Sequence, residues 1–262
     1  FHGPTLAFKD VALQLAGRLL DRELTLRDER ATVLVATSGD TGSAAIEACR
    51  GRDRLDIVVL HPEGRVSDVQ RRQMTTVDEP NVRNVAIDGD FDDCQALVKA
   101  SFADESLRGD LRLTAMNSIS WARVMSQVVY YVTSAAAVAP ERPVSFSVPT
   151  GNFGNVLAGW VASQGGVPVD RYVVGSNRND ILTRWIDTGV MQVDTVEPSL
   201  SPSMDIQVSS NVERYLWELY GRKGSVVDEA MATFRATGRL DIGEARLDRV
   251  RRSFSGVRVD DD

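Results

Sequence analysis

The stretch Ala31-Thr32-Val33-Leu34-Val35-Ala36-Thr37-Ser38-Gly39-Asp40-Thr41-Gly42-Ser43 joins a β-branched apolar run to a loop of glycine and small polar residues. The apolar run predicts a buried strand over 31–37, and the residues after it predict a helix over 41–50. The same alternation of apolar strands and amphipathic helices continues along the chain. We therefore expect an α/β protein with parallel sheets flanked by helices on both faces.

The remaining elements follow in the same alternation. Strands are expected over 56–60, 82–87, 111–115, 144–148 and 172–174, and helices over 67–76, 91–102, 120–137, 154–163, 179–187 and 209–222. Periodicity leaves open whether the strands form one sheet or two lobes, and the pattern weakens beyond residue 190. Both ends of the chain are expected to be truncated, because it begins inside a motif and its tail closes no recognisable element.

Composition narrows the classes of function. The 262 residues carry 30 basic and 37 acidic side chains, and the net charge of −7 argues against nucleic-acid and membrane partners. Two cysteines, Cys49 and Cys94, and two histidines are too few for a disulfide framework or a zinc site, so no metal is expected. The cysteines should pack as small apolar residues on helices, in a reducing, cytoplasmic setting. If the protein catalyses a reaction that side chains alone cannot perform, we expect an organic cofactor to carry it and the substrate to be a small molecule.

A lysine near the start of the chain is the first candidate for chemistry. Lys9 lies between an aromatic turn ending at Phe8 and a helix with apolar residues at 12, 15, 16 and 19, for which Thr5 is the expected N-cap. Partial burial and the positive end of the helix dipole would both lower the pKa of Lys9, as an amine nucleophile requires. The alternative is an ordinary solvated lysine.

Two strand-to-helix junctions are rich in glycine and small polar residues. The junction Pro149-Thr150-Gly151-Asn152-Phe153-Gly154-Asn155 resembles a phosphate cradle built from main-chain amides. The junction at 37–43 adds hydroxyl groups that suit a carboxylate or a second phosphate. Neither junction is a P-loop or a dinucleotide fingerprint, and both could be ordinary βα turns.

A third junction, Met116-Asn117-Ser118-Ile119-Ser120-Trp121-Ala122-Arg123, also opens a helix. Asn117, Ser118 and Arg123 could direct an amide, a hydroxyl and a guanidinium at an anion, and arginine binds two phosphate oxygens at once. The serines could equally cap the helix, with Arg123 in solvent. Together, the lysine, its aromatic neighbour and the anion cradles describe a site for pyridoxal phosphate and an anionic amino acid. A cofactor-free domain that binds a phosphate ligand is the alternative from another class.

Four motifs carry a resemblance to a known family. The string from His2 to Asp10, the two glycine-rich junctions, and Ser203-Met204-Asp205-Ile206-Gln207-Val208-Ser209-Ser210-Asn211 resemble blocks of the threonine synthase family. The resemblance implies a fold of type II of the pyridoxal-phosphate enzymes, like that of the tryptophan synthase β subunit. It implies the conversion of O-phospho-L-homoserine and water to L-threonine and phosphate. A phospholyase of the same group, releasing a 2-keto acid, is the nearest alternative.

The resemblance also implies roles for single residues and a division into lobes. Lys9 would be the Schiff-base lysine, with Phe8 beside it and Asp40 near the cofactor's 3-hydroxyl. The cofactor phosphate would be bound by Gly151, Asn152, Phe153, Gly154 and Asn155. The substrate carboxylate would be bound by Thr37, Ser38 and Thr41, and its phosphate by Asn117, Ser118 and Arg123. Residues 32–116 would form a smaller mobile lobe, and 1–31 with 117–262 a larger, incomplete cofactor-binding lobe. The oligomeric state stays open.

Overall fold

The computed structural model describes residues 3–261, and the chain divides into two compact units, Phe1–Ser126 and Gln127–Asp262. Phe1, His2 and Asp262 lie outside the described residues, and so does the start of the motif around Lys9. Each unit contains its own parallel sheet, which answers the question that periodicity left open. The expected lobe division at 32–116 concerns mobility and stays a prediction.

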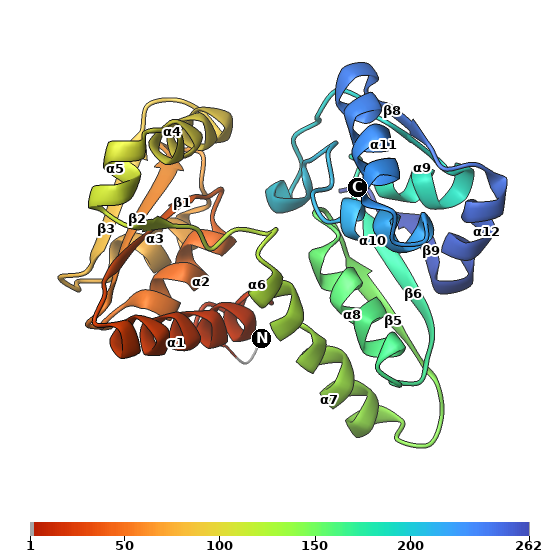
Figure 1. The fold of residues 1–262 in the computed structure, drawn as a ribbon, viewed down its shortest axis with the longest axis horizontal. Coiled ribbons are helices and arrows are strands. Elements are labelled where there is room, and N and C mark those ends of the chain that lie inside the picture. Colours follow the sequence, from red (N-terminus) through yellow and green to blue (C-terminus); the bar gives the residue numbers. More distant parts are fainter. Residues whose placement is uncertain (1–2, 262) are drawn as a thin grey trace. The chain divides into compact units, whose positions relative to one another are not determined.

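The first unit is built on a four-stranded sheet. Its strands are β1 (Ala31–Ala36), β2 (Leu55–Pro62), β3 (Val82–Ile87) and β4 (Leu113–Thr114), all parallel, in the order β3-β2-β1-β4 (Figure 1). Because the strands are parallel, the loops that follow β1, β2 and β4 leave the same edge of the sheet. That edge carries the first and third candidate junctions.

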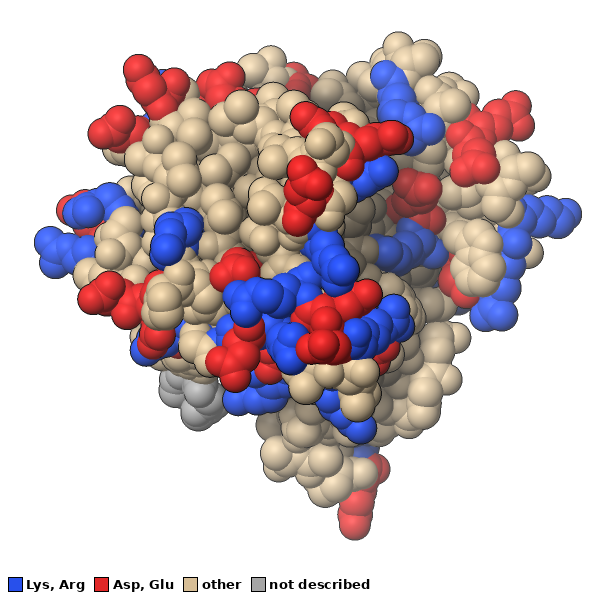
Figure 2. Space-filling view, turned by 60° about the vertical axis from the view of Figure 1, so that its left-hand side comes forward, with Lys and Arg blue, Asp and Glu red and all other residues tan. Residues whose placement is uncertain are grey.

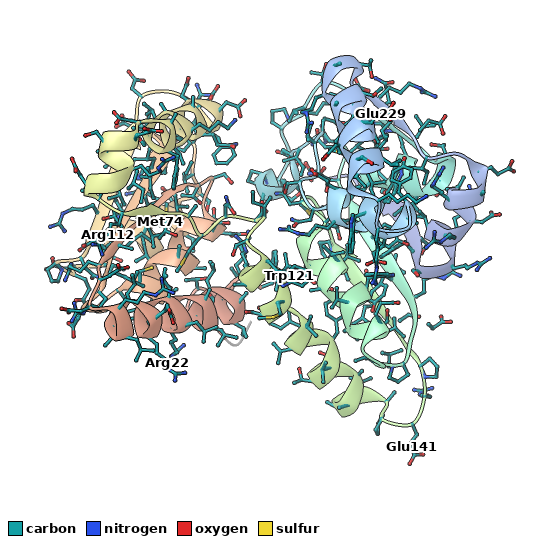
Figure 3. The ribbon with its side chains drawn as sticks, viewed as in Figure 1. Arg22, Met74, Arg112, Trp121, Glu141 and Glu229 are labelled. Atoms are coloured by element: carbon teal, nitrogen blue, oxygen red, sulfur yellow. The ribbon has the colours of Figure 1, made fainter. Side chains whose placement is uncertain are left out.

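Helices cover both faces of this sheet. They are α1 (Asp10–Arg27), α2 (Asp40–Cys49), α3 (Asp68–Thr75), α4 (Phe91–Ala103), α5 (Glu105–Asp110) and α6 (Trp121–Ser126). Side chains alternate along β1, so Val33 and Val35 pack with α1, α2 and Met74 of α3 (Figure 3), whereas Leu34 packs with α4. Cys49 and Cys94 are buried, free and helical, as expected, one in each of these two cores.

The second unit is built on a three-stranded parallel sheet with the order β5-β6-β9. Its strands are β5 (Val144–Pro149), β6 (Val169–Ser176) and β9 (Phe254–Arg258), and an antiparallel pair is formed by β7 (Val190–Gln192) and β8 (Arg239–Asp241). The helices are α7 (Val128–Val138), α8 (Gly154–Gln164), α9 (Ile181–Thr188), the 3-10 helix η1 (Pro202–Met204), α10 (Val212–Leu219), α11 (Gly224–Thr237) and α12 (Glu244–Ser253). The core of this unit is aromatic: Phe153, Trp185, Tyr215 and Phe254 contact one another.

Several expectations are corrected near the start of the chain. Thr5 is not the N-cap of α1, because its hydroxyl donates to Asp10 Oδ1 at 2.6 Å and the cap position is Lys9. The buried face of α1 also differs from the expected one. Leu13 is fully buried, whereas Leu15 and Leu19 are 41% and 46% exposed. Helical period alone could not choose between these neighbouring stripes.

The helix expected over 120–137 and the region beyond residue 190 also differ from the expectation. The helix expected over 120–137 is interrupted at Gln127, where the amide of Tyr130 bonds to the Gln127 carbonyl three residues back. The Ser126 hydroxyl also donates to the carbonyl of Ala122, a bond that tends to bend helices. The weak pattern beyond residue 190 nevertheless forms regular structure, and the tail supplies the edge strand β9.

Charged side chains of both signs are mixed on the surface. On the face that Figure 2 presents, basic and acidic side chains are interspersed, with no continuous field of one sign. Many charged side chains of the protein form ion pairs, such as Arg50–Glu47 at 2.7 Å and Arg54–Asp28 at 2.9 Å. None of the helices within residues 3–261 combines the length and the apolar composition that a bilayer crossing requires.

Candidate active site

Lys9 is buried at the start of α1, with 5% of its surface exposed. Its ammonium nitrogen lies 5.0 Å from the centre of the Phe8 ring and donates a hydrogen bond of 2.7 Å to Asp40 Oδ2. Burial lowers the pKa of Lys9, Asp40 opposes this shift, and the nearby charge of Arg123 adds to it. The net effect favours the neutral amine, which is the form that attacks a carbonyl carbon.

The carboxylate of Asp40 is held on two sides. Oδ2 accepts from Lys9, and Oδ1 accepts from the side-chain amide of Gln70, which lies in the first turn of α3. The Ser67 hydroxyl in turn donates to Gln70 Oε1 at 3.0 Å. Asp40 therefore contacts the lysine itself. The predicted contact of Asp40 with the 3-hydroxyl of a cofactor stays a prediction.

The first glycine-rich junction is shaped by Thr37 and Gly39. Thr37 is buried, and its hydroxyl oxygen accepts from the amides of Gly39 and Gly42, both at 2.9 Å. Gly39 has φ 144°, a conformation that only glycine adopts readily, and an added Cβ would lie 2.1 Å from Gln70 Oε1. The loop thus turns sharply into α2, whose first amides have no partner within the helix. A partly exposed hydroxyl on each side, Ser38 and Thr41, completes a surface suited to an anion.

The third junction places Arg123 within electrostatic reach of Lys9. Arg123 lies in α6, which packs against α1, and it is 4% exposed. Its positive charge contributes to the lowered pKa of Lys9. Asn117 is exposed and its carbonyl accepts from the amide of Ser120 at 3.3 Å, while Ser118 is half-buried. The unit therefore brings together Lys9 from the start of α1, Asp40 from the first junction and Arg123 from the third. Their roles toward a substrate stay predictions.

The second glycine-rich junction belongs to the other unit. Phe153 precedes α8 with φ 60° and its ring is fully buried in the aromatic core, so only its main chain is available to a ligand. The side chains of Asn152 and Asn155 are also engaged, since their Oδ1 atoms accept from the hydroxyls of Ser210 and Tyr131. The amides that open α8 have no partner within the helix, as the predicted phosphate cradle requires.

Several residues outside the predicted site hold these loops. The sequence does not mark Gln70, because nothing in a helical period shows which polar side chain turns toward a neighbouring loop. Ser209, Ser210 and Asn211 lie in a block noted for its resemblance only, yet they bond to Gly151 and Asn152. A block that combines three small polar residues just before a helix was the available signal.

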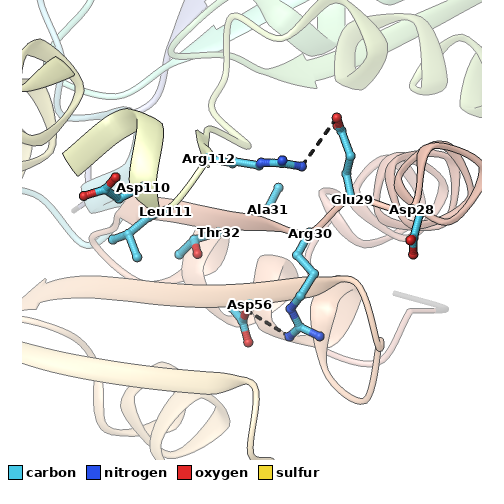
Figure 4. A pocket seen from close by; sticks show the side chains of 9 residues that line it. All are labelled: Asp28, Glu29, Arg30, Ala31, Thr32, Asp56, Asp110, Leu111 and Arg112. Atoms are coloured by element: carbon cyan, nitrogen blue, oxygen red, sulfur yellow. Dashed lines mark hydrogen bonds and ion pairs between the residues drawn. The ribbon is translucent and has the colours of Figure 1, made fainter. Parts of the chain in front are cut away.

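A separate hollow lies at the opposite edge of the sheet of the first unit, beside the start of β1 (Figure 4). It has a volume of about 350 Å³ and is lined by Asp28, Glu29, Arg30, Ala31, Thr32, Asp56, Asp110, Leu111 and Arg112. Its arginines are paired, Arg30 with Asp56 at 3.0 Å and Arg112 with Glu29 at 3.4 Å. None of the predicted site residues lines it. Within residues 3–261, no cluster of side chains has the composition of a metal site.

The chain matches the model of one enzyme family over most of its length. A model of the family described as "Pyridoxal-phosphate dependent enzyme" matches residues 1–241. The chain therefore belongs to the pyridoxal-phosphate-dependent enzyme family, and its fold is fold type II of that family, like the tryptophan synthase β subunit.

Particular relatives are threonine synthases. The chain is 55% identical over its whole length to the threonine synthase of Pseudomonas aeruginosa, of which it covers 56%. The crystal structure of threonine synthase from Brucella melitensis with bound pyridoxal phosphate is similar with a TM-score of 0.95 and 51% identity, over 99% of this chain and 56% of that one. For yeast threonine synthase the TM-score is 0.93 at 38% identity, over 99% of this chain and 55% of that one. The chain thus spans about half the length of the relatives it matches.

Proposed function

We propose that the protein uses pyridoxal phosphate to convert O-phospho-L-homoserine and water to L-threonine and phosphate. The observation that carries the proposal is the buried Lys9, whose pKa is lowered and whose amine bonds to Asp40. The similarity to threonine synthases over the whole chain supports the substrate. The proposal includes a cytoplasmic location, which the two free cysteines support.

The residues present fit the cofactor. Pyridoxal phosphate needs an amine that is neutral when it reacts, and burial favours that form of Lys9. It also needs an anion cradle, and the amides of Gly151 to Asn155 at the start of α8 are suited to this role. When bound, the cofactor supplies an electron sink for charge that develops on the amino-acid carbon.

The other assignments follow from the groups that each junction offers. The hydroxyls of Thr37, Ser38 and Thr41 and the first amides of α2 would bind the substrate carboxylate. Asn117, Ser118 and Arg123 would bind its phosphate, because a guanidinium accommodates two phosphate oxygens in its planar fork. Asp40 would orient the Lys9 amine through the bond of 2.7 Å.

Proton movement is assigned to Lys9. Its amine takes the proton from the α-carbon of the substrate and returns a proton there when the product forms. Each transfer requires the amine to lie within about 3 Å of the donor or acceptor atom. Removal of a β-proton then allows the γ-phosphate to leave, stabilised by Arg123. The γ-carbon takes up a proton to become the methyl group of the product, and water adds its hydroxyl at the β-carbon. A base that loses and regains its proton repeatedly needs a pKa near the working pH, which the burial of Lys9 favours.

Product analysis tests the proposed function. Purified protein with added pyridoxal phosphate and O-phospho-L-homoserine should release threonine and phosphate in equal amounts. Release of a 2-keto acid and ammonia without threonine would instead establish a phospholyase. A protein that neither binds the cofactor nor consumes the substrate would favour the alternative of a cofactor-free domain that binds a phosphate ligand.

The lobe assignment has its own test. We propose that residues 32–116 move as a smaller lobe when the substrate binds. A substrate analogue should then change amide exchange in that range more than elsewhere. Equal exchange profiles with and without the analogue would contradict this.

A further inference from the structure

The segment 199–211, here called the clamp segment, lies against the 151–155 loop within the second unit. The Ser209 hydroxyl donates to the carbonyl of Gly151 at 2.7 Å. Asn211 donates twice to the carbonyl of Asn152, from its main-chain amide at 3.1 Å and from Nδ2 at 3.0 Å. The Ser210 hydroxyl donates to Asn152 Oδ1 at 3.0 Å.

These bonds determine the direction of the main-chain amides in the loop. In a planar trans peptide, the carbonyl oxygen of one residue and the amide hydrogen of the next point to opposite sides. Holding the carbonyl of Gly151 therefore directs the amide of Asn152 away from the clamp segment. Holding the carbonyl of Asn152 does the same for the amide of Phe153. The clamp segment thus presets two adjacent N–H groups that the proposed phosphate cradle needs.

The clamp segment is itself anchored to the end of β6. Asp205 Oδ1 accepts from the amide groups of Asn177 at 2.7 Å and Asn179 at 3.1 Å, and from the Ser199 hydroxyl at 2.6 Å. The two asparagines are 4% and 5% exposed. A buried, fully bonded polar network of this kind holds a loop in one arrangement.

Close packing joins the two segments as well. A Cβ on Gly151 would lie 3.2 Å from the carbonyl oxygen of Ser203 and 3.3 Å from Met204 Cα. Asn211 is fully buried. Its main-chain amide and Nδ2 both donate to the Asn152 carbonyl, and its Oδ1 accepts from Arg214, so each of these three atoms is hydrogen-bonded. The loop cannot turn its carbonyls without breaking these contacts.

We propose that Ser209 and Asn211 are positioning residues for the cofactor phosphate: they contact the loop and not the ligand, and they set the affinity for the phosphate group through the direction of the loop amides. The inference rests on the proposed function, in which the 151–155 loop binds the phosphate of pyridoxal phosphate.

The test compares two ligands that differ only in the phosphate. Dissociation constants for pyridoxal phosphate and for pyridoxal are measured by equilibrium dialysis for the wild-type protein, Ser209→Ala, Asn211→Asp and the control Ser201→Ala. The control makes the same chemical change within the clamp segment, where Ser201 bonds to Asn177 at 3.0 Å and not to the loop. Asn177 keeps its bonds to Ser199 and Asp205, both at 2.7 Å, so the clamp segment stays anchored in this variant. Thermal unfolding of each variant reports whether it is folded.

Ser209→Ala should weaken pyridoxal phosphate about tenfold, the loss expected when one hydrogen bond that directs an amide is removed. Affinity for pyridoxal should stay at the wild-type value, as should both affinities of Ser201→Ala. Asn211→Asp places a carboxylate oxygen against the Asn152 carbonyl and should have the larger effect. If Asn211→Asp does not fold, the affinities of Ser209→Ala alone test the positioning role.

The outcomes separate the inference from the proposed function. A wild-type protein that binds both ligands equally, or neither, refutes the assignment of the phosphate to the 151–155 loop. A wild-type protein that prefers pyridoxal phosphate, with the same preference in folded Ser209→Ala and Asn211→Asp, refutes the positioning role. An equal loss of both ligands in Ser209→Ala also refutes it, because a general structural role would weaken both.

Discussion

Asp40→Asn should lower the pKa of Lys9 further. The substitution keeps the shape of the side chain and removes the negative charge that Lys9 Nζ contacts at 2.7 Å. Burial favours the neutral amine and Asp40 is the main influence that opposes it, so without the charge the neutral form is favoured more strongly.

The size of the effect follows from the contact. A hydrogen bond to a charged group contributes about 1.5–3 kcal/mol, and 1.36 kcal/mol corresponds to one pH unit. The Asp40 side chain is 28% exposed, so solvent screens only part of this interaction. The pKa of Lys9 should therefore fall, and at a fixed pH below that pKa the fraction of neutral amine should rise by about tenfold or more, since about 1.4 kcal/mol corresponds to a factor of ten.

The assay measures Lys9 directly in protein freed of cofactor. An amine-reactive acylating reagent is applied at a series of pH values, and the modification of the peptide that contains Lys9 is quantified by mass spectrometry. The control is Asp68→Asn, since that side chain is 82% exposed and lies 3.5 Å from Arg71. The control should leave the Lys9 profile unchanged. An Asp40→Asn profile that coincides with wild type, or moves to higher pH, would refute the electrostatic account of Lys9.

Three further substitutions test the structure through stability. Gly159→Ala should destabilise the protein by about 2 kcal/mol in urea titrations, because a Cβ would lie 2.6 Å from rings of Tyr131 and Tyr172; overpacking of about 3 kcal/mol exceeds a helix-propensity gain of about 1 kcal/mol. A stabilised variant would show that these rings are placed wrongly. Lys9→Met should stabilise the protein more at neutral pH than at alkaline pH. The pKa of Lys9 is lowered in the folded protein and is about 10.4 in the unfolded chain, so between these two pKa values the unfolded chain binds the extra proton. Wild-type stability therefore rises with pH up to about pH 10.4, and the variant should lack this rise. Parallel pH profiles would contradict it. Asp90→Ala removes the capping box of α4 and should cost about 1 kcal/mol, and an unchanged urea midpoint would count against that cap.

The sequence predicted the central strands of the first unit's sheet well because they are largely buried. Such strands are nearly continuous apolar runs, and the strand expected over 31–37 is β1, Ala31–Ala36. Loops that follow parallel strands leave the same edge of the sheet, so the junctions after β1 and β4 lie at one edge. The electrostatic effect of Arg123 on Lys9 agrees with that rule.

Other features had no local signal. The edge strand β9 contains Ser255, Gly256 and Arg258, so its composition is not that of a buried strand, and its position depends on pairing with β6. The bond from Gln70 to Asp40 joins residues 30 positions apart, and it depends on the rotation of α3 about its own axis. The hydrogen bonds between the clamp segment and the 151–155 loop join residues 58 or 59 positions apart in the sequence. Sequence patterns describe which elements form, but such side-chain contacts depend on how those elements pack.

The most direct test of the central claim is to locate the cofactor on the chain. The purified protein is incubated with pyridoxal phosphate, reduced with borohydride and digested, and the modified peptide is identified by mass spectrometry. We predict a single stable cofactor adduct on Lys9, which Lys9→Ala abolishes while the fold is retained. An adduct on the other lysines, Lys99 or Lys223, with Lys9 unmodified, or no adduct at all, would contradict the assignment of Lys9 as the cofactor lysine.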